Sequence, residues 1–388
     1  MLLSAATFMI FFQGYMVAPL IPRLATLFAV SPARMGLIVP AYLIAYGMAV
    51  LFFGPLSDRL GRKPVILASL GGFVLFTALT GVAQRLATLL SARFLTGLVA
   101  SGVIPVAVAL VGDAFPYEDR GRALGWLFGA MAGGMAFGSS VGAILEPYIT
   151  WRGLFFGVAL ITALVVVALM RAAKFPARPK RSGPAGGWRS TLAAWWRLLA
   201  TSRSQRAYVY VFLNAVFQSG VYTWLGYYFV RRYGLGEVGV GLALIGYGVP
   251  GLVLGPTIGR LADRSGRRLL IPGGLAVGGI SALILGFRGG VLLAAVVVAT
   301  LSLGYDMTQP LLAGVVTDLG APQGVAVGLM AFVLFIGFGI GSIVFSAAMS
   351  SAGLGPALWQ FGGAAVAAAV VGVPLFRGET AHSGRAEV

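Results

Sequence analysis

Long apolar stretches separated by short polar loops run along the whole chain of 388 residues. Each stretch holds about 20 residues, which as an α-helix is long enough to cross roughly 30 Å of hydrocarbon. Runs such as LVVVAL are apolar on every face, whereas a strand of a membrane barrel alternates apolar and polar residues. The pattern predicts an all-α membrane protein with twelve transmembrane helices. The predicted spans are 3–28, 35–56, 65–84, 88–112, 122–145, 151–171, 207–230, 238–258, 269–287, 290–315, 322–350 and 356–376.

Composition supports the membrane class and excludes several chemistries. Hydrophobic residues make up 59% of the chain and charged residues 10%, more apolar surface than a soluble fold can bury. The chain has no cysteine, and its one histidine, His382, lies in the polar tail. A thiolate nucleophile, an intramembrane histidine base and a metal site are therefore not expected, and neither is a cofactor. No G-x-x-x-x-G-K-[ST] phosphate loop is present, which argues against direct use of ATP. We expect a protein that is not an enzyme.

The net charge of +17 reflects membrane orientation rather than a nucleic-acid partner. With a cytoplasmic N-terminus, 20 of the 28 Lys and Arg fall in cytoplasmic loops or the tail, and seven lie toward the outside. This excess follows the positive-inside rule. We therefore expect a multi-pass protein of a plasma or bacterial inner membrane, with both termini cytoplasmic. Since Met1 opens almost directly into the first span, a leader could precede it.

A basic segment at 171–206 separates six predicted spans from six others. It holds nine Lys and Arg and no Asp or Glu. Pro and Gly interrupt its first part, while Trp188, Trp195 and Trp196 occupy the second. Two interpretations stay open, an amphipathic helix at the membrane surface and a flexible tether attracted to anionic headgroups.

A loop motif occurs twice and predicts two equivalent halves. GPLSDRLGRKP at 54–64 returns as GRLADRSGRR at 259–268, and Asp58 and Asp263 stand 205 positions apart. Asp113 and Asp318 repeat the same offset. Duplication on this scale indicates two bundles of six helices. The expected organisation is an N-terminal bundle (1–170), a linker (171–206), a C-terminal bundle (207–376) and a tail (377–388).

The residue types in the motif suit a gate. Gly54 would let neighbouring helices approach, and Gly61 would permit the tight turn. Asp58 can pair with Arg62 and hold helix ends together in one conformation. The alternative is a loop that only orients the protein by its positive charge.

The doubled motif resembles the major facilitator superfamily of secondary transporters, whose pattern is approximately G-x-L-a-D-r-x-G-r-k. In its motif pattern the chain looks closest to the drug/proton antiporter branch. The resemblance covers essentially the whole chain and implies two pseudo-symmetric six-helix bundles. It also implies that the motif stabilises the outward-facing state. The gating residues it identifies are Gly54, Asp58, Arg59, Gly61, Arg62, Lys63, Asp113, Gly259, Asp263, Arg264, Gly266, Arg267, Arg268 and Asp318.

Two further segments carry the resemblance. Arg93, four residues before Gly97, matches an R-x-x-x-G arrangement whose arginine is associated with coupling in related proton-driven exporters. The alternative is an arginine that joins helices by hydrogen bonds and has only a structural role. Gly134, Gly138 and Gly142 match the glycines of an antiporter signature, although a serine stands in place of its proline. The same glycines would also serve helix packing alone.

Asp306 is an acidic residue deep within a predicted span. An ionised carboxylate is costly there, so Asp306 is a candidate to carry a proton. The alternative is a permanently hydrogen-bonded side chain, held by Tyr305, Thr308, Gln309 or an arginine. Glu146 and Glu237 lie near predicted span ends, where we expect them to be solvated.

By resemblance, the first, fourth, seventh and tenth spans line a central cavity. Asn214, Gln218 and Tyr222 recur at four-residue intervals and could face a ligand, or could join helices by hydrogen bonds. Tyr227 and Tyr228 are expected to anchor at the membrane interface. The candidate cavity residues are Gln13, Tyr15, Met131, Met135, Asn214, Gln218, Tyr222, Tyr305 and Gln309.

These features favour a monomeric secondary transporter that exports a small amphipathic or drug-like substrate in exchange for protons. One alternative is a carrier of a small organic anion held by Arg93 and Arg23. Another is a membrane sensor that does not transport.

Overall fold

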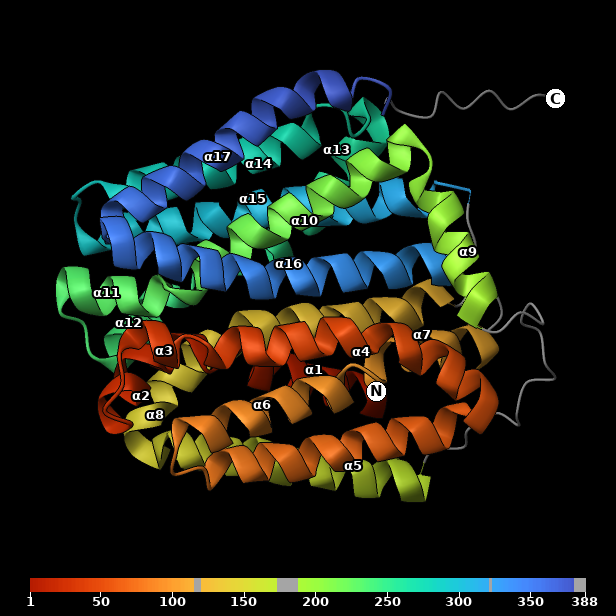
Figure 1. The fold of residues 1–388 in the computed structure, drawn as a ribbon, viewed down its shortest axis with the longest axis horizontal. Helices are drawn as coiled ribbons and strands as arrows, with labels where there is room; N and C mark the ends of the chain where they lie inside the picture. The colour runs from red at the N-terminus through yellow and green to blue at the C-terminus, as the bar shows by residue number, and fades with distance from the viewer. Residues whose placement is uncertain (115–119, 173–187, 321–322, 380–388) are drawn as a thin grey trace.

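The structure is a computed structural model that describes residues 1–114, 120–172, 188–320 and 323–379. The first part of the predicted linker, 173–187, and most of the tail, including His382, lie outside these ranges. All regular structure within them is helical (Figure 1). The helices are α1 (Leu2–Tyr15), η1 (Ala18–Leu20), α2 (Ile21–Leu27), α3 (Pro32–Met35), α4 (Ile38–Leu60), α5 (Arg62–Gly81), α6 (Leu86–Ala100), α7 (Val103–Ala114), α8 (Arg120–Ala172), α9 (Trp188–Leu199), α10 (Ser202–Thr223), α11 (Leu225–Tyr233), α12 (Glu237–Leu244), α13 (Val249–Ser265), α14 (Leu270–Gly286), α15 (Val291–Thr317), α16 (Gln323–Ala352) and α17 (Leu354–Leu375).

The helices coincide with the predicted spans, and several spans are broken into two helices. Within the described residues, nine helical segments are long and apolar enough to cross a membrane, and α14 is a shorter apolar helix. Spans predicted at 122–145 and 151–171 both lie within α8, which is broken at the non-helical residue Thr150, with φ 62° and ψ 160°. With α8 counted as two spans, the nine segments and α14 account for eleven of the twelve predicted crossings, and the remaining one, 207–230, lies over α10 and α11.

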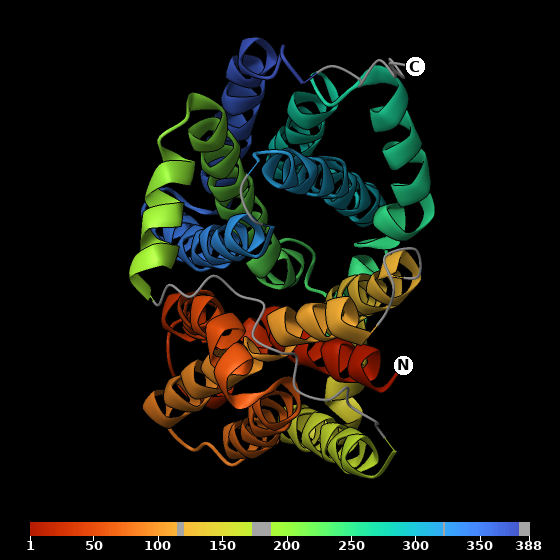
Figure 2. The same cartoon turned by 90° about the vertical axis from the view of Figure 1, so that its right-hand side faces the viewer.

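The helices form two groups that follow the two halves of the sequence. Viewed along the long helices, α1–α8 form one group and α10–α17 the other (Figure 2). The N-terminus, the C-terminal segment and α9 lie at one end of the molecule, which we call the terminal end (Figures 1 and 2). The turns at Gly61 and Gly266 lie at this end as well.

The two groups meet along α4 and α16, and at the opposite end α11 and α12 of one group contact η1, α2 and α8 of the other (Figure 1). Several of the contacts at this end are so close that only glycine fits. A Cβ on Gly241 of α12 would lie 2.7 Å from the Ser140 carbonyl oxygen of α8, and one on Gly226 would lie 2.5 Å from Pro19. We call this the closed end, because backbone meets backbone across the seam there.

A row of glycines on α8 packs against α1. Cβ atoms on Gly134 and Gly138 would lie 2.5 and 2.6 Å from the carbonyl oxygens of Phe8 and Phe12, and Gly142 meets Met16 in the same way. Small residues at four-residue spacing allow such close helix crossings. The glycines of the antiporter-like signature therefore have a packing role within the N-terminal half.

Replacing Gly138 with alanine should destabilise the fold by about 1–3 kcal/mol, because the added methyl group overlaps the Phe12 carbonyl. The matched control is Gly129→Ala on the same helix, where a Cβ meets nothing within 4 Å. That variant should be neutral or stabilised by up to about 1 kcal/mol. Thermal unfolding in detergent compares the two, and equal melting temperatures would contradict the packing role.

Candidate functional site

A cavity lies between the two halves, and aromatic side chains make up five of its thirteen lining residues. In this conformation its volume is about 20 Å³. Among the predicted cavity residues, Tyr15, Met135, Gln218, Tyr222 and Tyr305 line it. The remaining lining residues, which the sequence did not single out, are Gly14, Ala18, Val39, Leu43, Ser219, Thr223, Tyr247 and Phe338.

The tyrosines of the cavity pack against one another at tilted angles, and one of these contacts crosses the seam. The ring centroid of Tyr222 lies 5.4 Å from that of Tyr15 and 4.3 Å from that of Tyr247. Tyr15 belongs to α1 of the N-terminal half, whereas Tyr222 is on α10 of the C-terminal half and Tyr247 lies between α12 and α13. A ligand in the cavity would therefore touch both halves, and its binding would respond to their relative movement.

Two polar atoms in this wall are buried without a hydrogen-bond partner among the described residues. The Gln218 amide donates to the Tyr247 hydroxyl, which leaves the Gln218 carbonyl oxygen unpaired. The Tyr222 hydroxyl is also unpaired. Buried polar groups without partners are uncommon in folded proteins. These two atoms can accept and donate hydrogen bonds to a bound molecule.

Four predicted cavity residues lie away from the lining. Gln13 is fully buried and accepts a bond from Arg93, while Asn214 donates to the Gln309 side chain across 3.4 Å. Met131 is partly buried on α8 and packs against the core. The hydrogen bond between Asn214 and Gln309 matches the alternative in which Asn214 joins helices.

Arg93 is completely buried and joins three helices of the N-terminal half. Its guanidinium donates to the Gln13 side-chain oxygen at 2.7 Å, the Ile38 carbonyl at 3.3 Å and the Gly14 carbonyl at 3.4 Å. It also lies 4.5 Å from the ring centroid of Tyr42, a favourable cation–π distance. Because Gly14 lines the cavity, Arg93 is one layer behind its wall.

Asp306 lies beside the break between α12 and α13. Its carboxylate accepts a hydrogen bond from the Ser302 hydroxyl at 3.1 Å, and the same hydroxyl accepts from the Gly248 N–H at 2.9 Å. A Cβ on Gly251, in the first turn of α13, would lie 2.7 Å from the Asp306 carboxylate. Negative charge is favourable at a helix N-terminus. The side chain that donates a hydrogen bond to Asp306 is Ser302, which is not among the residues expected from the sequence.

The expectation that Glu146 is solvated is wrong. Its side chain is only 6% exposed, because α8 continues past it to Thr150 instead of ending. Arg23 Nε lies 3.8 Å from the Glu146 carboxylate and 3.9 Å from that of Glu237. Since Glu237 begins α12, this triad links the two halves at the closed end. Glu237 itself is partly exposed, as expected.

The expectation that Tyr228 anchors at the membrane interface is also wrong. Tyr228, predicted as an interface anchor, is 2% exposed and packs against Phe229 and Tyr233 within the protein. Its neighbour Tyr227 is partly exposed.

The two copies of the loop motif form equivalent ion pairs at the terminal end. Arg62 pairs with Asp58 at 2.6 Å and with Asp113 at 3.0 Å. In the second copy, Arg267 pairs with Asp318 at 2.6 Å. The repeat found in the sequence is therefore also a repeat of contacts, although the Asp263 side chain lies outside the described ones.

The glycines of the motif have different roles. Gly61 and Gly266 adopt φ values of 99° and 75°, which suit glycine and allow the tight turns. The expectation that Gly54 permits a close helix approach is wrong, since a Cβ there meets nothing within 4 Å, and the same holds for Gly259. Neither position is a tight helix contact in this conformation. The remaining basic residues of the motif are Arg59, Lys63, Arg264 and Arg268.

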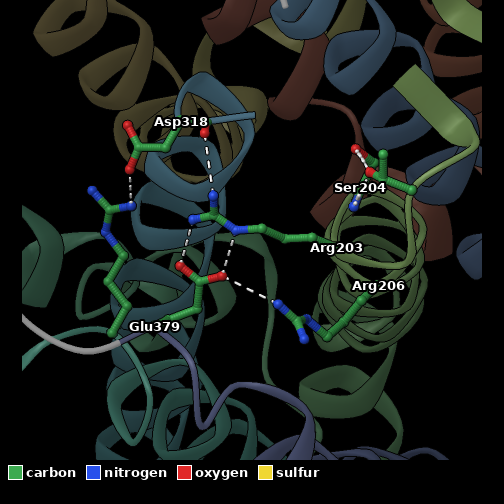
Figure 3. Close-up of polar contacts among 7 residues, drawn as sticks. Arg203, Ser204, Arg206, Asp318 and Glu379 are labelled. Carbon is green, nitrogen blue, oxygen red and sulfur yellow. Dashed lines mark hydrogen bonds and ion pairs between the residues drawn. The ribbon is translucent and has the colours of Figure 1, made fainter. Parts of the chain in front are cut away.

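A carboxylate from the chain after α17 adds to the second copy. The Glu379 carboxylate accepts from Arg203 at 2.8 Å and from Arg206 at 3.2 Å (Figure 3). Its backbone carbonyl accepts from the N–H groups of Arg267 and Arg268. Glu379 is nearly buried. The hydrogen bond from Arg203, together with the surrounding arginines, lowers the pKa of this carboxyl below its ordinary value. This cluster joins α10, the turn before α14 and the C-terminal segment.

The lowered pKa predicts how stability changes with pH. Glu379 stabilises the fold fully above its unfolded pKa of about 4.3, and the contribution is lost as pH falls through the lower folded value. Glu379→Gln should therefore cost about 1–3 kcal/mol at neutral pH, and the difference from wild type should shrink below about pH 4. The melting temperatures of wild type and variant, measured about every pH unit from roughly pH 3 to pH 8, check this. A pH-independent difference would contradict the ion-pair account.

Comparison with known proteins decides the family. Residues 3–342 match the Major Facilitator Superfamily. This chain is a member of that superfamily. It is 28% identical over 283 residues to an uncharacterized MFS-type transporter, YwfA, of Bacillus subtilis (strain 168), covering 70% of this chain and 65% of that relative. It is 33% identical over 135 residues to Multidrug resistance protein 3 of the same organism, covering 34% of this chain and 26% of that protein.

The fold agrees with solved structures of the superfamily. A bacterial homologue of the human lysosomal transporter Spinster, in an inward-facing and unoccupied conformation, superposes with a TM-score of 0.77 at 18% identity. The superposition covers 97% of this chain and 94% of that one. The two helical groups are thus the two bundles of the superfamily fold, whose members transport solutes and are not enzymes. Within the described residues no three acidic or histidine side chains gather as a metal site would require.

Proposed function

We propose that the chain exports small amphipathic compounds in exchange for protons by alternating access. The observation that carries the proposal is the tyrosine-lined cavity between the halves, with unpartnered atoms of Gln218 and Tyr222 in its wall. A mostly apolar lining with few polar groups suits an amphipathic molecule, and the cavity would have to widen by movement of the two halves to admit it. The similarity to a protein named for multidrug resistance supports the same class.

The distribution of contacts between the halves supports alternating access. Backbone contacts seal the closed end, so a substrate would reach the cavity from the terminal end in this conformation. If the basic loops face the cytoplasm, this is the inward-facing state, in which an exporter loads its substrate. We propose that the protein acts as a monomer in the cell membrane, with both termini cytoplasmic.

The organic-anion alternative depended on two arginines, and both have other partners. Arg93 donates to carbonyl and amide oxygens behind the cavity wall, and Arg23 lies between two carboxylates. An anionic ligand would have to replace these contacts. The contacts of the arginines therefore favour the amphipathic substrate.

Asp306 supplies a mechanism for proton coupling. The ionised carboxylate is stabilised by the N-terminus of α13 and by Ser302, and both interactions weaken when it takes a proton. Protonation would thus loosen the break between α12 and α13, directly beside Tyr247 of the cavity. In this way proton binding would alter both the cavity and the helix that closes the seam.

We predict that Asp306→Asn abolishes accumulation driven by a pH gradient while leaving substrate exchange within about twofold of wild type. Asparagine can still accept from Ser302 but cannot carry a proton across the membrane. Proteoliposomes loaded with substrate measure both activities in one preparation. Unchanged uphill transport would remove Asp306 from the proton pathway.

A thermal-shift panel of amphipathic cations, neutral drugs and aromatic carboxylates tests the substrate class, followed by counterflow with the best binder. We expect amphipathic compounds to stabilise the protein and to exchange, and Gln218→Ala to weaken their binding. Rapid counterflow of a carboxylate without competition from lipophilic compounds would favour the organic-anion carrier. Binding without counterflow of any ligand would favour the nontransporting sensor.

A further inference from the structure

The linker helix α9 has a geometry unlike that of the spanning helices. It runs across the ends of α10 and α16 at the terminal end instead of alongside them (Figure 1). Viewed toward that end, it lies at the margin of the C-terminal half (Figure 2). A helix in this position lies in the plane of a membrane surface when the long helices cross the bilayer.

One face of α9 is packed against the protein. Leu198 is 6% exposed, and Trp195 and Leu199 pack against the core. This contact fixes the rotation of the helix about its axis. The direction of its other face is therefore set by the protein.

The other face is apolar and uncovered. Trp196 is 76% exposed and Leu192, one turn earlier, is 46% exposed. Arg189 comes three residues before Leu192 in the same helix, and Arg197 is exposed at the edge of this face. Tryptophan and leucine beside arginine are typical of helices that bury one face at the boundary between headgroups and acyl chains.

Charge identifies the partner. The segment from Arg171 to Arg206 holds nine basic residues and no acidic one. Such a segment is attracted to a membrane surface that contains anionic lipid, with each basic residue near the surface contributing about 1 kcal/mol. A protein partner of opposite charge would not account for a helix that lies in the plane of the bilayer surface.

We propose that α9 is an anionic-phospholipid binding element, with Leu192 and Trp196 inserted among acyl chains and Arg197 contacting headgroup phosphates. The helix would hold the terminal end of the C-terminal half against the membrane. Since α9 packs on α10 and α16, the lipid would contact the half that contains Asp306. This proposal does not depend on the transported substrate.

The cysteine-free chain allows a direct test by site-directed spin labelling. Leu192→Cys and Trp196→Cys, each nitroxide-labelled, are placed in nanodiscs of phosphatidylcholine alone or mixed with phosphatidylglycerol. Arg122→Cys, exposed at the terminal end, is the matched control. For each label we measure the ratio of its accessibility to oxygen to its accessibility to a water-soluble nickel chelate. In the anionic discs we expect this ratio to be several-fold higher for both α9 labels than for the control label.

A charge variant separates lipid binding from simple burial. Arg189→Gln combined with Arg197→Gln should reduce the phosphatidylglycerol retained by the purified protein severalfold and leave its melting temperature unchanged. Labels at 192 and 196 that match the control in both lipids would overturn the proposal. So would labels shielded from both oxygen and nickel, which would indicate a covering protein, or unchanged lipid retention in the charge variant.

Discussion

Arg93→Leu will reduce transport by at least about tenfold while leaving the melting temperature close to that of wild type. The guanidinium holds α1, α4 and α6 together through contacts with Gln13, Gly14 and Ile38. Hydrogen bonds to a charged group contribute about 1.5–3 kcal/mol each, so their loss in one conformation shifts the equilibrium by tenfold or more. Stability should change little, because leucine also removes the cost of burying a charge.

Arg93→Lys and Arg288→Gln serve as controls. Lysine keeps the charge but not the planar set of donors, so transport should be intermediate. Arg288 is exposed, and its replacement should change neither property. Initial rates in proteoliposomes and melting curves give both quantities. If Arg93→Leu transports normally, the arginine is dispensable, and if the variant fails to fold, its role is structural.

Gly241→Leu will drive the protein out of the conformation seen here. A Cβ at this position would lie 2.6 Å from Ile144 and 2.7 Å from the Ser140 carbonyl, and the backbone of α8 cannot move aside locally. An overlap of this kind costs about 1–3 kcal/mol, which changes the ratio of two states by about 5–150-fold. The closed end should open and the terminal end should close.

Distances between paired spin labels at the two ends measure this shift, because the chain has no cysteine of its own. Gly157→Leu is the matched control, since a Cβ there meets nothing within 4 Å. We expect longer distances at the closed end for Gly241→Leu alone. Identical distance distributions in the two variants would show that the seam at Gly241 does not control the conformation.

The sequence predicted the features that depend on repetition and on backbone geometry. Duplication placed Arg62 and Arg267 in equivalent surroundings, and the short loops required glycine at 61 and 266. The apolar stretches located the membrane spans, because hydrocarbon thickness fixes the length of a spanning helix. These constraints act locally along the chain, so they can be read from it directly.

The cavity was only partly predictable, for reasons that the individual residues make clear. Spacing placed Asn214, Gln218 and Tyr222 on one helix face, but the neighbouring helix decides which of them reaches the cavity. Tyr247 was missed because it lies at a helix break that apolar composition does not signal. Glu146 was misread because the helix continues to Thr150, beyond the predicted span end at 145, and the side chain is buried there.

The central claim is that protons drive the transport of an amphipathic substrate through the cavity between the halves. Flux of the best-binding compound into proteoliposomes, with and without an imposed pH gradient, tests it most directly. We predict accumulation against the substrate gradient that disappears when a protonophore is added. Flux of the same rate and extent with and without the pH gradient would contradict the account.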